Sequence, residues 1–310
     1  MNVSSEHEAL TVTGLSHRYG SRDALSEVSF TVEAGSIFAL LGPNGGGKTT
    51  LFRIVSTLLP TSSGHVHVFG RDVADQAAEV RRLIGVVFQS PAVDLRLTVR
   101  ENLRSYGNLY GLRGAHLTSL IDDALALVEL DDRASDQVHT LSGGLQRRVE
   151  LAKVLLPEPR VLILDEPSTG LDPGARREIR DHLDRLCRDR GTTVVLTTHL
   201  MDEAARADRV AILHLGSLVA LGTPQDLVSE IGGDVLLVTS PDLETLATAI
   251  RDRFQQPVTI LDGHLRIERA RGHEFITDLV EAFPGQIDTV TFGKPTLEDV
   301  FLHHTGQRWN

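Results

Sequence analysis

The chain has 310 residues, a formal net charge of −11 and an apolar fraction of 41%. This length accommodates one large domain and a small one, and the apolar fraction is enough to form a full core. The acidic balance argues against a protein that wraps nucleic acid, whose contact surface would be basic, so we expect no nucleic-acid partner.

The cysteine count and the hydropathy pattern indicate a cytoplasmic protein. Cys187 is the only cysteine, which excludes an intrachain disulfide and gives no sign of an oxidising compartment. Residues 1–10 lack the basic and apolar stretches of a signal peptide, and no apolar run approaches the eighteen or so residues that span a bilayer. We therefore expect no direct membrane insertion, so that any membrane part would come from another subunit.

Residues 10–30 alternate loosely between apolar and polar side chains, and Gly14 and Gly20 interrupt them, which predicts short antiparallel strands. Tyr19 lies in this region. A tyrosine on a strand is usually a core residue, but one that lies near a bound nucleotide would be able to stack on its base. The sequence leaves both interpretations open.

Residues 42–50 fit the phosphate-binding pattern G-x-x-x-x-G-K-[ST]. They lie between an apolar run at 37–41, which predicts a buried strand, and an amphipathic run at 48–59, which predicts a helix. Glycines let backbone N–H groups approach the phosphates, Lys48 would neutralise the β and γ phosphates, and the Thr49 hydroxyl would ligate Mg²⁺. The predicted loop residues are Gly42, Pro43, Asn44, Gly45, Gly46, Gly47, Lys48, Thr49 and Thr50.

Three further predicted strands end in polar side chains. Because the carboxyl ends of parallel strands form the ligand crevice of an α/β sheet, we expect these side chains to share one site. Asp165 would lie near the Mg²⁺, and Glu166 would orient or deprotonate water. The strands and their polar ends are 84–88 with Gln89, 161–164 with Asp165 and Glu166, and 193–198 with His199.

Residues 98–137 have the apolar spacing of helices and interrupt the alternation of strands and helices, which predicts an inserted helical lobe at about 91–140. After it, residues 141–148 open another helix. Ser142 is a plausible N-cap there, and two glycines leave the helix N-terminus open to an anion. Ser-Gly-Gly before a helix is a weak signal by itself.

Together these stretches resemble the nucleotide-binding subunits of ATP-binding cassette (ABC) transporters over roughly residues 10–230. The resemblance implies an α/β fold of the P-loop NTPase class, with a mixed sheet core, an antiparallel β subdomain and the inserted helical subdomain. It also implies ATP and Mg²⁺ as cofactors. The matched positions are Tyr19 for adenine stacking, 42–50 for the Walker A loop, Gln89 for the Q-loop, 141–146 for the family signature, Asp165 and Glu166 for Walker B, 169–172 for the D-loop and His199 for the switch histidine.

The resemblance also implies a role for each matched residue. Glu166 is expected to polarise the attacking water, while Gln89 and His199 sense the γ-phosphate and the metal. Thr49, Gln89 and Asp165 are the expected metal ligands.

A homodimer on ATP binding is a further implication. Two copies would close head to tail, with Ser142 of one copy facing the ATP that Lys48 of the other copy holds. Asp172 would bridge the copies. The signature residues expected to act across this dimer are Ser142, Gly143, Gly144 and Gln146.

Two positions depart from the usual family pattern. Gly46 stands where the family usually has Ala or Ser, which we expect to loosen the loop slightly without removing a backbone donor. Leu145 replaces the usual Gln of the signature, but Ser142 and the glycines are intact. Neither departure puts activity in doubt.

Other motifs look like those of exporter ATPases of the daunorubicin-resistance type, which partner ABC-2 type transmembrane permease subunits. This implies a peripheral location at the inner face of the cell membrane. An alternative is a soluble ABC ATPase of iron–sulfur cluster assembly, or another ATP-driven assembly factor; a non-catalytic nucleotide-binding scaffold is disfavoured because Glu166 is present. The motifs of the exporter type are at 197–204, 207–212, 222–224 and 295–302.

Residues 233–310 are predicted to form an accessory or regulatory domain that follows the ABC domain at 1–232. The order βαββαβ is that of a ferredoxin-like fold, and the segment has no catalytic constellation. Its 12 acidic and 7 basic residues give it a net charge of −5. The predicted elements are a strand at 234–239, a helix at 243–254, a hairpin of 258–261 and 264–268 about Asp262-Gly263, a helix at 274–283 and a strand at 287–292.

Overall fold

The computed structural model describes residues 7–90, 92–261, 263–307 and 309, so Pro91 and Asp262 of the predicted segments lie outside it. The chain forms two compact units, Met1–Leu221 and Gly222–Asn310. This division falls earlier in the chain than the predicted boundary after residue 232. The reason is that α8 (Pro224–Ser229) packs against α11 (Leu297–Thr305) in the second unit.

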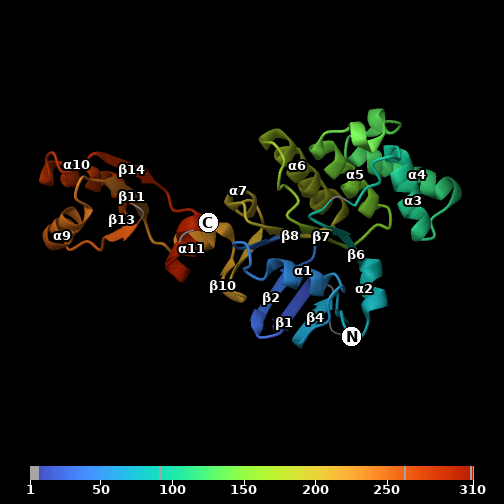
Figure 1. Cartoon of the computed structure of the whole chain (residues 1–310), viewed down its shortest axis with the longest axis horizontal. Coiled ribbons are helices and arrows are strands. Elements are labelled where there is room, and N and C mark those ends of the chain that lie inside the picture. Colours follow the sequence, from blue (N-terminus) through green and yellow to red (C-terminus); the bar gives the residue numbers. More distant parts are fainter. Residues whose placement is uncertain (1–6, 91, 262, 308, 310) are drawn as a thin grey trace. The chain divides into compact units, whose positions relative to one another are not determined.

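A six-stranded sheet with the order β10-β9-β3-β8-β7-β6 forms the centre of the first unit (Figure 1). The strands β9, β3, β8, β7 and β6 run parallel, so their carboxyl ends lie along one edge, as predicted. Every residue of β3, β7 and β8 is buried, which matches their apolar sequences. The bounds are β3 Ile37–Leu41, β6 Ile84–Val87, β7 Val161–Asp165, β8 Thr193–Thr198, β9 Arg209–His214 and β10 Ser217–Gly222.

A second, antiparallel sheet has the order β2-β1-β4-β5. Its first two strands have 12 residues each, longer than the short strands predicted. Gly14 does not end β1, because its positive φ of 55° lets the strand pass through a bulge and continue to Tyr19. The bounds are β1 Glu8–Tyr19, β2 Arg22–Glu33, β4 Ser63–Val68 and β5 Arg71–Asp72.

The helix α1 (Lys48–Val55) lies between these two sheets, and its apolar face completes their common core (Figure 1). It ends four residues before the predicted end at 59, because Ser56 caps it and Thr57 adopts a positive φ of 61°. Phe30 and Phe38 stack across the same core with their ring centroids 5.0 Å apart. The loop between β3 and α1 is therefore held at both ends by buried structure.

The predicted helical lobe contains α3 (Val99–Leu109) and α4 (Gly114–Leu127), which pack against each other and against α5 (Gly143–Leu155). Thr98 and Glu101 form a capping box at the start of α3. The other α-helices among the described residues of the first unit are α2 (Ala77–Leu83), α6 (Pro173–Arg190) and α7 (Met201–Ala204), and short 3₁₀ helices lie at Asp131–Arg133 and Val138–Thr140. No helix among the described residues is long and apolar enough to cross a membrane.

The second unit has the predicted βαββαβ order, in a four-stranded antiparallel sheet of order β12-β13-β11-β14. Leu236 and Ile267 of the sheet pack against Phe275 and other apolar residues of the two intervening helices. The ferredoxin-like prediction is therefore confirmed, with α8 and α11 as additions to it. The bounds are β11 Asp234–Thr239, α9 Leu243–Phe254, β12 Thr259–Leu261, β13 His264–Arg269, α10 Gly272–Ala282 and β14 Thr289–Gly293.

Candidate active site

The glycine-rich loop after β3 leads directly into α1. Gly47 is the N-cap of that helix and has φ 105°, and a Cβ there would lie 2.7 Å from the carbonyl oxygen of Ala24. Only glycine fits this position. Because no side chain caps α1, the N–H groups of its first turn are available to an anion.

Lys48 is buried at the start of α1 and turns back over the loop. Its Nζ donates hydrogen bonds to the carbonyl oxygens of Gly42, at 2.6 Å, and Pro43, at 3.1 Å, and lies 4.0 Å from Oε1 of Glu166. Burial lowers the pKa of Lys48, while the nearby carboxylates of Glu166 and Asp165 oppose that shift. The ammonium group is therefore a desolvated cation beside the loop.

A pocket of about 450 Å³ lies over this loop. Tyr19 is 46% exposed and lines the pocket, so it is not a core residue. Arg22, which pairs with Tyr19 in the hairpin of β1 and β2, lines the pocket as well and lies beside Gly45. The residues that line the pocket are Tyr19, Arg22, Ala24, Asn44, Gly45, Gly47, Lys48, Thr49, Thr50, Gln89 and Glu166.

Glu166 follows β7 in a left-handed backbone conformation, with φ 46°. Its backbone N–H is anchored on Thr197, with the carbonyl oxygen at 3.1 Å and the hydroxyl oxygen at 3.0 Å. This anchor holds a backbone conformation that costs a non-glycine residue energy, and such residues gather at functional sites. The carboxylate is directed toward the pocket as a result.

Three side chains meet the carboxylate of Glu166. Gln89 Nε2 donates a hydrogen bond of 3.2 Å to Oε2, Thr169 Oγ1 donates one of 3.1 Å to the same oxygen, and His199 Nδ1 lies 3.3 Å from Oε1. The predicted convergence of residues from the ends of β6, β7 and β8 is therefore present in the fold. Glu166 is held by polar contacts on both oxygens.

Asp165 is buried beside Glu166 at the end of β7. Burial is the main cause that raises the pKa of Asp165, and the Thr197 hydroxyl, which donates a hydrogen bond of 2.5 Å to Oδ1, opposes it. The charge of Glu166 also raises this pKa, whereas Lys48 and Arg147 lower it. A buried carboxyl group with shifted titration beside a polar pocket is typical of a functional site.

Arg22 and Thr197 were not singled out in the sequence. The sequence feature that points to Arg22 as a pocket residue is its position three residues after Tyr19, across a tight turn. The feature that points to Thr197 is its position near the end of a buried strand. Thr197 faces Asp165 because the two residues are register partners in β7 and β8. Such a partnership depends on which strands are neighbours.

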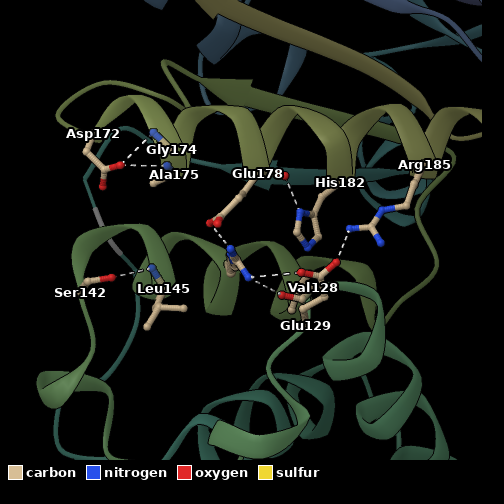
Figure 2. A network of polar contacts seen from close by, with 11 residues as sticks. Val128, Glu129, Ser142, Leu145, Asp172, Gly174, Ala175, Glu178, His182 and Arg185 are labelled. Carbon is tan, nitrogen blue, oxygen red and sulfur yellow. Dashed lines mark hydrogen bonds and ion pairs between the residues drawn. The ribbon is translucent and has the colours of Figure 1, made fainter.

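The residues predicted to act across a dimer lie outside this pocket, at the starts of two helices (Figure 2). The Ser142 hydroxyl accepts a hydrogen bond from the N–H of Leu145 at the start of α5. Asp172 accepts hydrogen bonds from the N–H groups of Gly174 and Ala175 at the start of α6. Both side chains are exposed helix caps in this single chain.

The other signature residues hold the same turn together. The Gln146 side chain donates hydrogen bonds to the carbonyl oxygens of Val138 and Leu141, at 3.2 and 3.0 Å, so its amide is directed back into its own chain. A Cβ at Gly144 would lie 2.8 Å from that of Ala175, which brings the starts of α5 and α6 close together. The signature and the D-loop therefore form one continuous edge.

A comparison with protein families matches residues 25–169 to the family described as ABC transporter. A daunorubicin resistance ATP-binding protein, DrrA3 of Streptomyces coeruleorubidus, is 39% identical over 309 residues, covering 96% of each chain. A Nod factor export ATP-binding protein I of Rhizobium johnstonii is 37% identical over 301 residues, covering 96% of this chain and 95% of that one.

Solved structures of ATP-binding cassettes have the same fold. CbiO1 of Clostridium perfringens, part of an ABC transporter complex, aligns with a TM-score of 0.68 and 28% identity over 81% of this chain. A dimeric post-hydrolysis structure of an ATP-binding cassette with bound ADP and phosphate aligns with a TM-score of 0.61 and 27% identity over 69% of this chain. The motifs, the fold and these relatives lead to one conclusion: the chain belongs to the ATP-binding subunits of ABC transporters and is an ATPase.

Proposed function

We propose that this ATPase is the ATP-binding subunit of an export complex and drives transport through separate membrane subunits of the ABC-2 type. The names of its relatives support export, since they describe resistance to daunorubicin and export of Nod factor. The alignments extend over 96% of this chain, so they include the second unit as well as the cassette. Because such a subunit works on a membrane permease, we place the protein at the cytoplasmic face of the cell membrane.

The phosphates of ATP would bind over the loop at residues 42–50. Backbone N–H groups at the open N-terminus of α1 and the ammonium of Lys48 supply donors and positive charge there. The exposed ring of Tyr19 lines this pocket and would stack on the adenine, and the guanidinium of Arg22, which lines the same pocket, would add positive charge.

The proposed Mg²⁺ ligands are Thr49, Gln89 and Asp165. Their side chains offer a hydroxyl, an amide and a carboxylate oxygen, which are the ligands that Mg²⁺ takes together with phosphate oxygens and water. Thr49 and Gln89 line the pocket. Asp165 is close enough that its charge raises the pKa of Lys48, which also lines the pocket. When bound, the ion would neutralise charge on the transferred phosphate.

Glu166 is the proposed base that orients water and accepts its proton. Gln89, Thr169 and His199 contact its two oxygens and fix the direction of the carboxylate. His199 and Gln89 would thereby link the state of the γ-phosphate to Glu166. Most of the rate enhancement would come from such prearranged charges and dipoles.

A head-to-tail homodimer would complete the ATP site. Ser142 caps α5 on an exposed edge, and the N–H groups of Gly143 and Gly144 beside it would suit the γ-phosphate of ATP bound to the other copy. Asp172 begins α6 on the same edge, where it would bridge the copies. A solved cassette that this chain resembles is dimeric, which supports the formation of a dimer.

The first prediction concerns Glu166→Gln, which keeps the shape of the side chain and removes its charge. We expect the kcat for Mg-ATP hydrolysis to fall by about 10²-fold or more, because proton transfer to a positioned base contributes that much. ATP binding should persist and hold two copies together, whereas Lys48→Ala should weaken nucleotide binding itself.

The matched control for this prediction is Glu158→Gln. Glu158 has the same positive-φ conformation, with φ 51°, but it is exposed at the opposite end of β7, so its substitution should leave kcat unchanged. Steady-state hydrolysis and nucleotide titration measure both variants. An unchanged kcat in Glu166→Gln would contradict the assignment.

The second prediction concerns the contact with the membrane subunit. Residues 90–106 follow Gln89 and expose apolar side chains, among them Leu95, which is 47% exposed. A largely apolar cavity of about 230 Å³ lies beside them, lined by Phe88, Tyr106 and Tyr110 among others. We propose that a cytoplasmic helix of the permease docks on the exposed apolar side chains of residues 90–106, Leu95 among them, and on this cavity.

Leu95→Asp should therefore abolish export and complex formation in cells while it spares basal ATPase activity, because it adds a charge to the docking surface alone. Leu215→Asp is the control, since Leu215 is 72% exposed in a turn whose positive φ aspartate tolerates. Co-purification with the permease measures complex formation. If Leu95→Asp leaves export and complex intact, the docking site lies elsewhere.

The third prediction concerns the second unit, to which we assign a role in assembly or regulation. All of the proposed ATP-site residues precede it in the chain, and its net charge of −5 over residues 233–310 disfavours anionic lipid as a partner. Truncation after Leu221, at the boundary between the units, should leave nucleotide binding and part of the basal hydrolysis.

Self-association or assembly with the permease should weaken in this truncated chain, as light scattering and pull-down would measure against the full-length chain. A truncated chain that stays folded by circular dichroism but binds no ATP would show that the second unit belongs to the catalytic site.

A further inference from the structure

Three charged residues of α5 are buried on one face of that helix. Arg147, Glu150 and Lys153 are 9, 2 and 8% exposed and recur every three residues, which aligns them along the helix. Burying a charge is costly unless it is paired and hydrogen-bonded, so each of these groups must have partners. Those partners are mainly backbone groups beside the proposed catalytic residues.

The guanidinium of Arg147 contacts the backbone on both sides of the proposed site. Its Nη1 donates a 2.6 Å hydrogen bond to the carbonyl oxygen of Phe88, the residue before Gln89. Its Nη2 and Nε donate to the carbonyl oxygens of Asp165 and Pro167, both at 3.2 Å, and these two residues flank Glu166. One rigid planar fork therefore joins the end of β6 to the end of β7.

The other two charged residues extend this junction. Glu150 accepts a 2.8 Å hydrogen bond from Nη1 of Arg147 and a 2.6 Å hydrogen bond from the N–H of Ala92. Lys153 donates to the carbonyl oxygen of Ala92. The chain is thus held by α5 both before and after Gln89.

We propose that Arg147 is a positioning residue for ATP hydrolysis, holding the two backbone segments that present Gln89 and Glu166 to each other. The 3.2 Å hydrogen bond between those side chains spans the two segments that the guanidinium joins. Because Ser142 is the N-cap of α5, the same helix connects the signature to this pair. The inference rests on the roles proposed above for Gln89 and Glu166.

Arg148 provides a matched comparison on the same helix. It is also a buried arginine with a carbonyl and carboxylate partners, Val128, Glu129 and Glu178, but its partners belong to the helical lobe and to α6. Figure 2 shows these partners beside His182 and Arg185 of α6. None of the partners lines the ATP pocket. A substitution of Arg148 therefore removes a buried arginine from α5 without removing a hydrogen bond to the backbone around Glu166.

The experiment compares kcat, the KM for ATP and the thermal midpoint of Arg147→Gln, Arg147→Lys and Arg148→Gln in the full-length protein. Arg147→Gln should lower kcat by about 10- to 100-fold, the cost of a misplacement of about 1 Å, with the KM for ATP within about threefold of wild type. Arg147→Lys keeps the charge without the fork and should recover only part of kcat. Arg148→Gln should keep kcat within about twofold.

A double variant separates positioning from general destabilisation. In the Gln89→Ala background, adding Arg147→Gln should lower kcat little further, because both changes act on the same pair of side chains. A wild-type kcat in Arg147→Gln, or equal losses of kcat and thermal midpoint in Arg147→Gln and Arg148→Gln, would overturn the proposal. If Arg147→Gln does not fold, a wild-type kcat in Arg147→Lys would overturn it.

The single variants Gln89→Ala and Glu166→Gln distinguish this inference from the proposed function. If both keep wild-type kcat, the proposed roles of these residues fail and the inference fails with them. If both lose activity while Arg147→Gln does not, only the inference is overturned.

Discussion

The arrangement of the site in the first unit depends on the polar contacts that the carboxylate of Glu166 makes. Three side chains contact this carboxylate: Gln89 from the end of β6, Thr169 from the segment after β7 and His199 from the end of β8. Lys48 approaches from the loop after β3. A parallel sheet puts these four chain positions on one edge, and the anchored left-handed backbone of Glu166 turns its side chain toward them.

Burial of charge in this region supports a functional origin for these contacts. Lys48, Asp165, Arg147 and Glu150 are all buried, and an apolar core would hold the same elements together without the cost of desolvating charged groups. Each charge instead contacts the loop, the strand ends or another charge. Stability alone does not explain this concentration, whereas control over the positions of the proposed catalytic groups does.

The parts of the site that follow from local patterns could be predicted from the sequence. The glycine-rich loop, and the apolar runs that end in Gln89, in Asp165 and Glu166, and in His199, are each contained within a few residues, so periodicity is enough to locate them. The second unit was also predictable because its strands and helices alternate clearly. Its boundary was not, since α8 belongs to that unit through its packing against α11, which lies far along the chain.

The remaining features depend on contacts between segments far apart in the chain. Arg22 lines the pocket because the hairpin of β1 and β2 positions it there. Thr197 contacts Asp165 because β7 pairs with β8. The sequence around Arg147 indicates only a charged helix, because its carbonyl partners come from two other segments. The continuation of β1 through Gly14 likewise depends on a bulge that the alternation of side chains does not reveal.

The most direct test of the central claim is a crystal structure of the Glu166→Gln variant with Mg-ATP. The account predicts one nucleotide over residues 42–50, with its γ-phosphate within about 3.2 Å of both Lys48 Nζ and the Ser142 hydroxyl of a second copy. A nucleotide bound elsewhere, or a dimer in which Ser142 faces solvent, would contradict it.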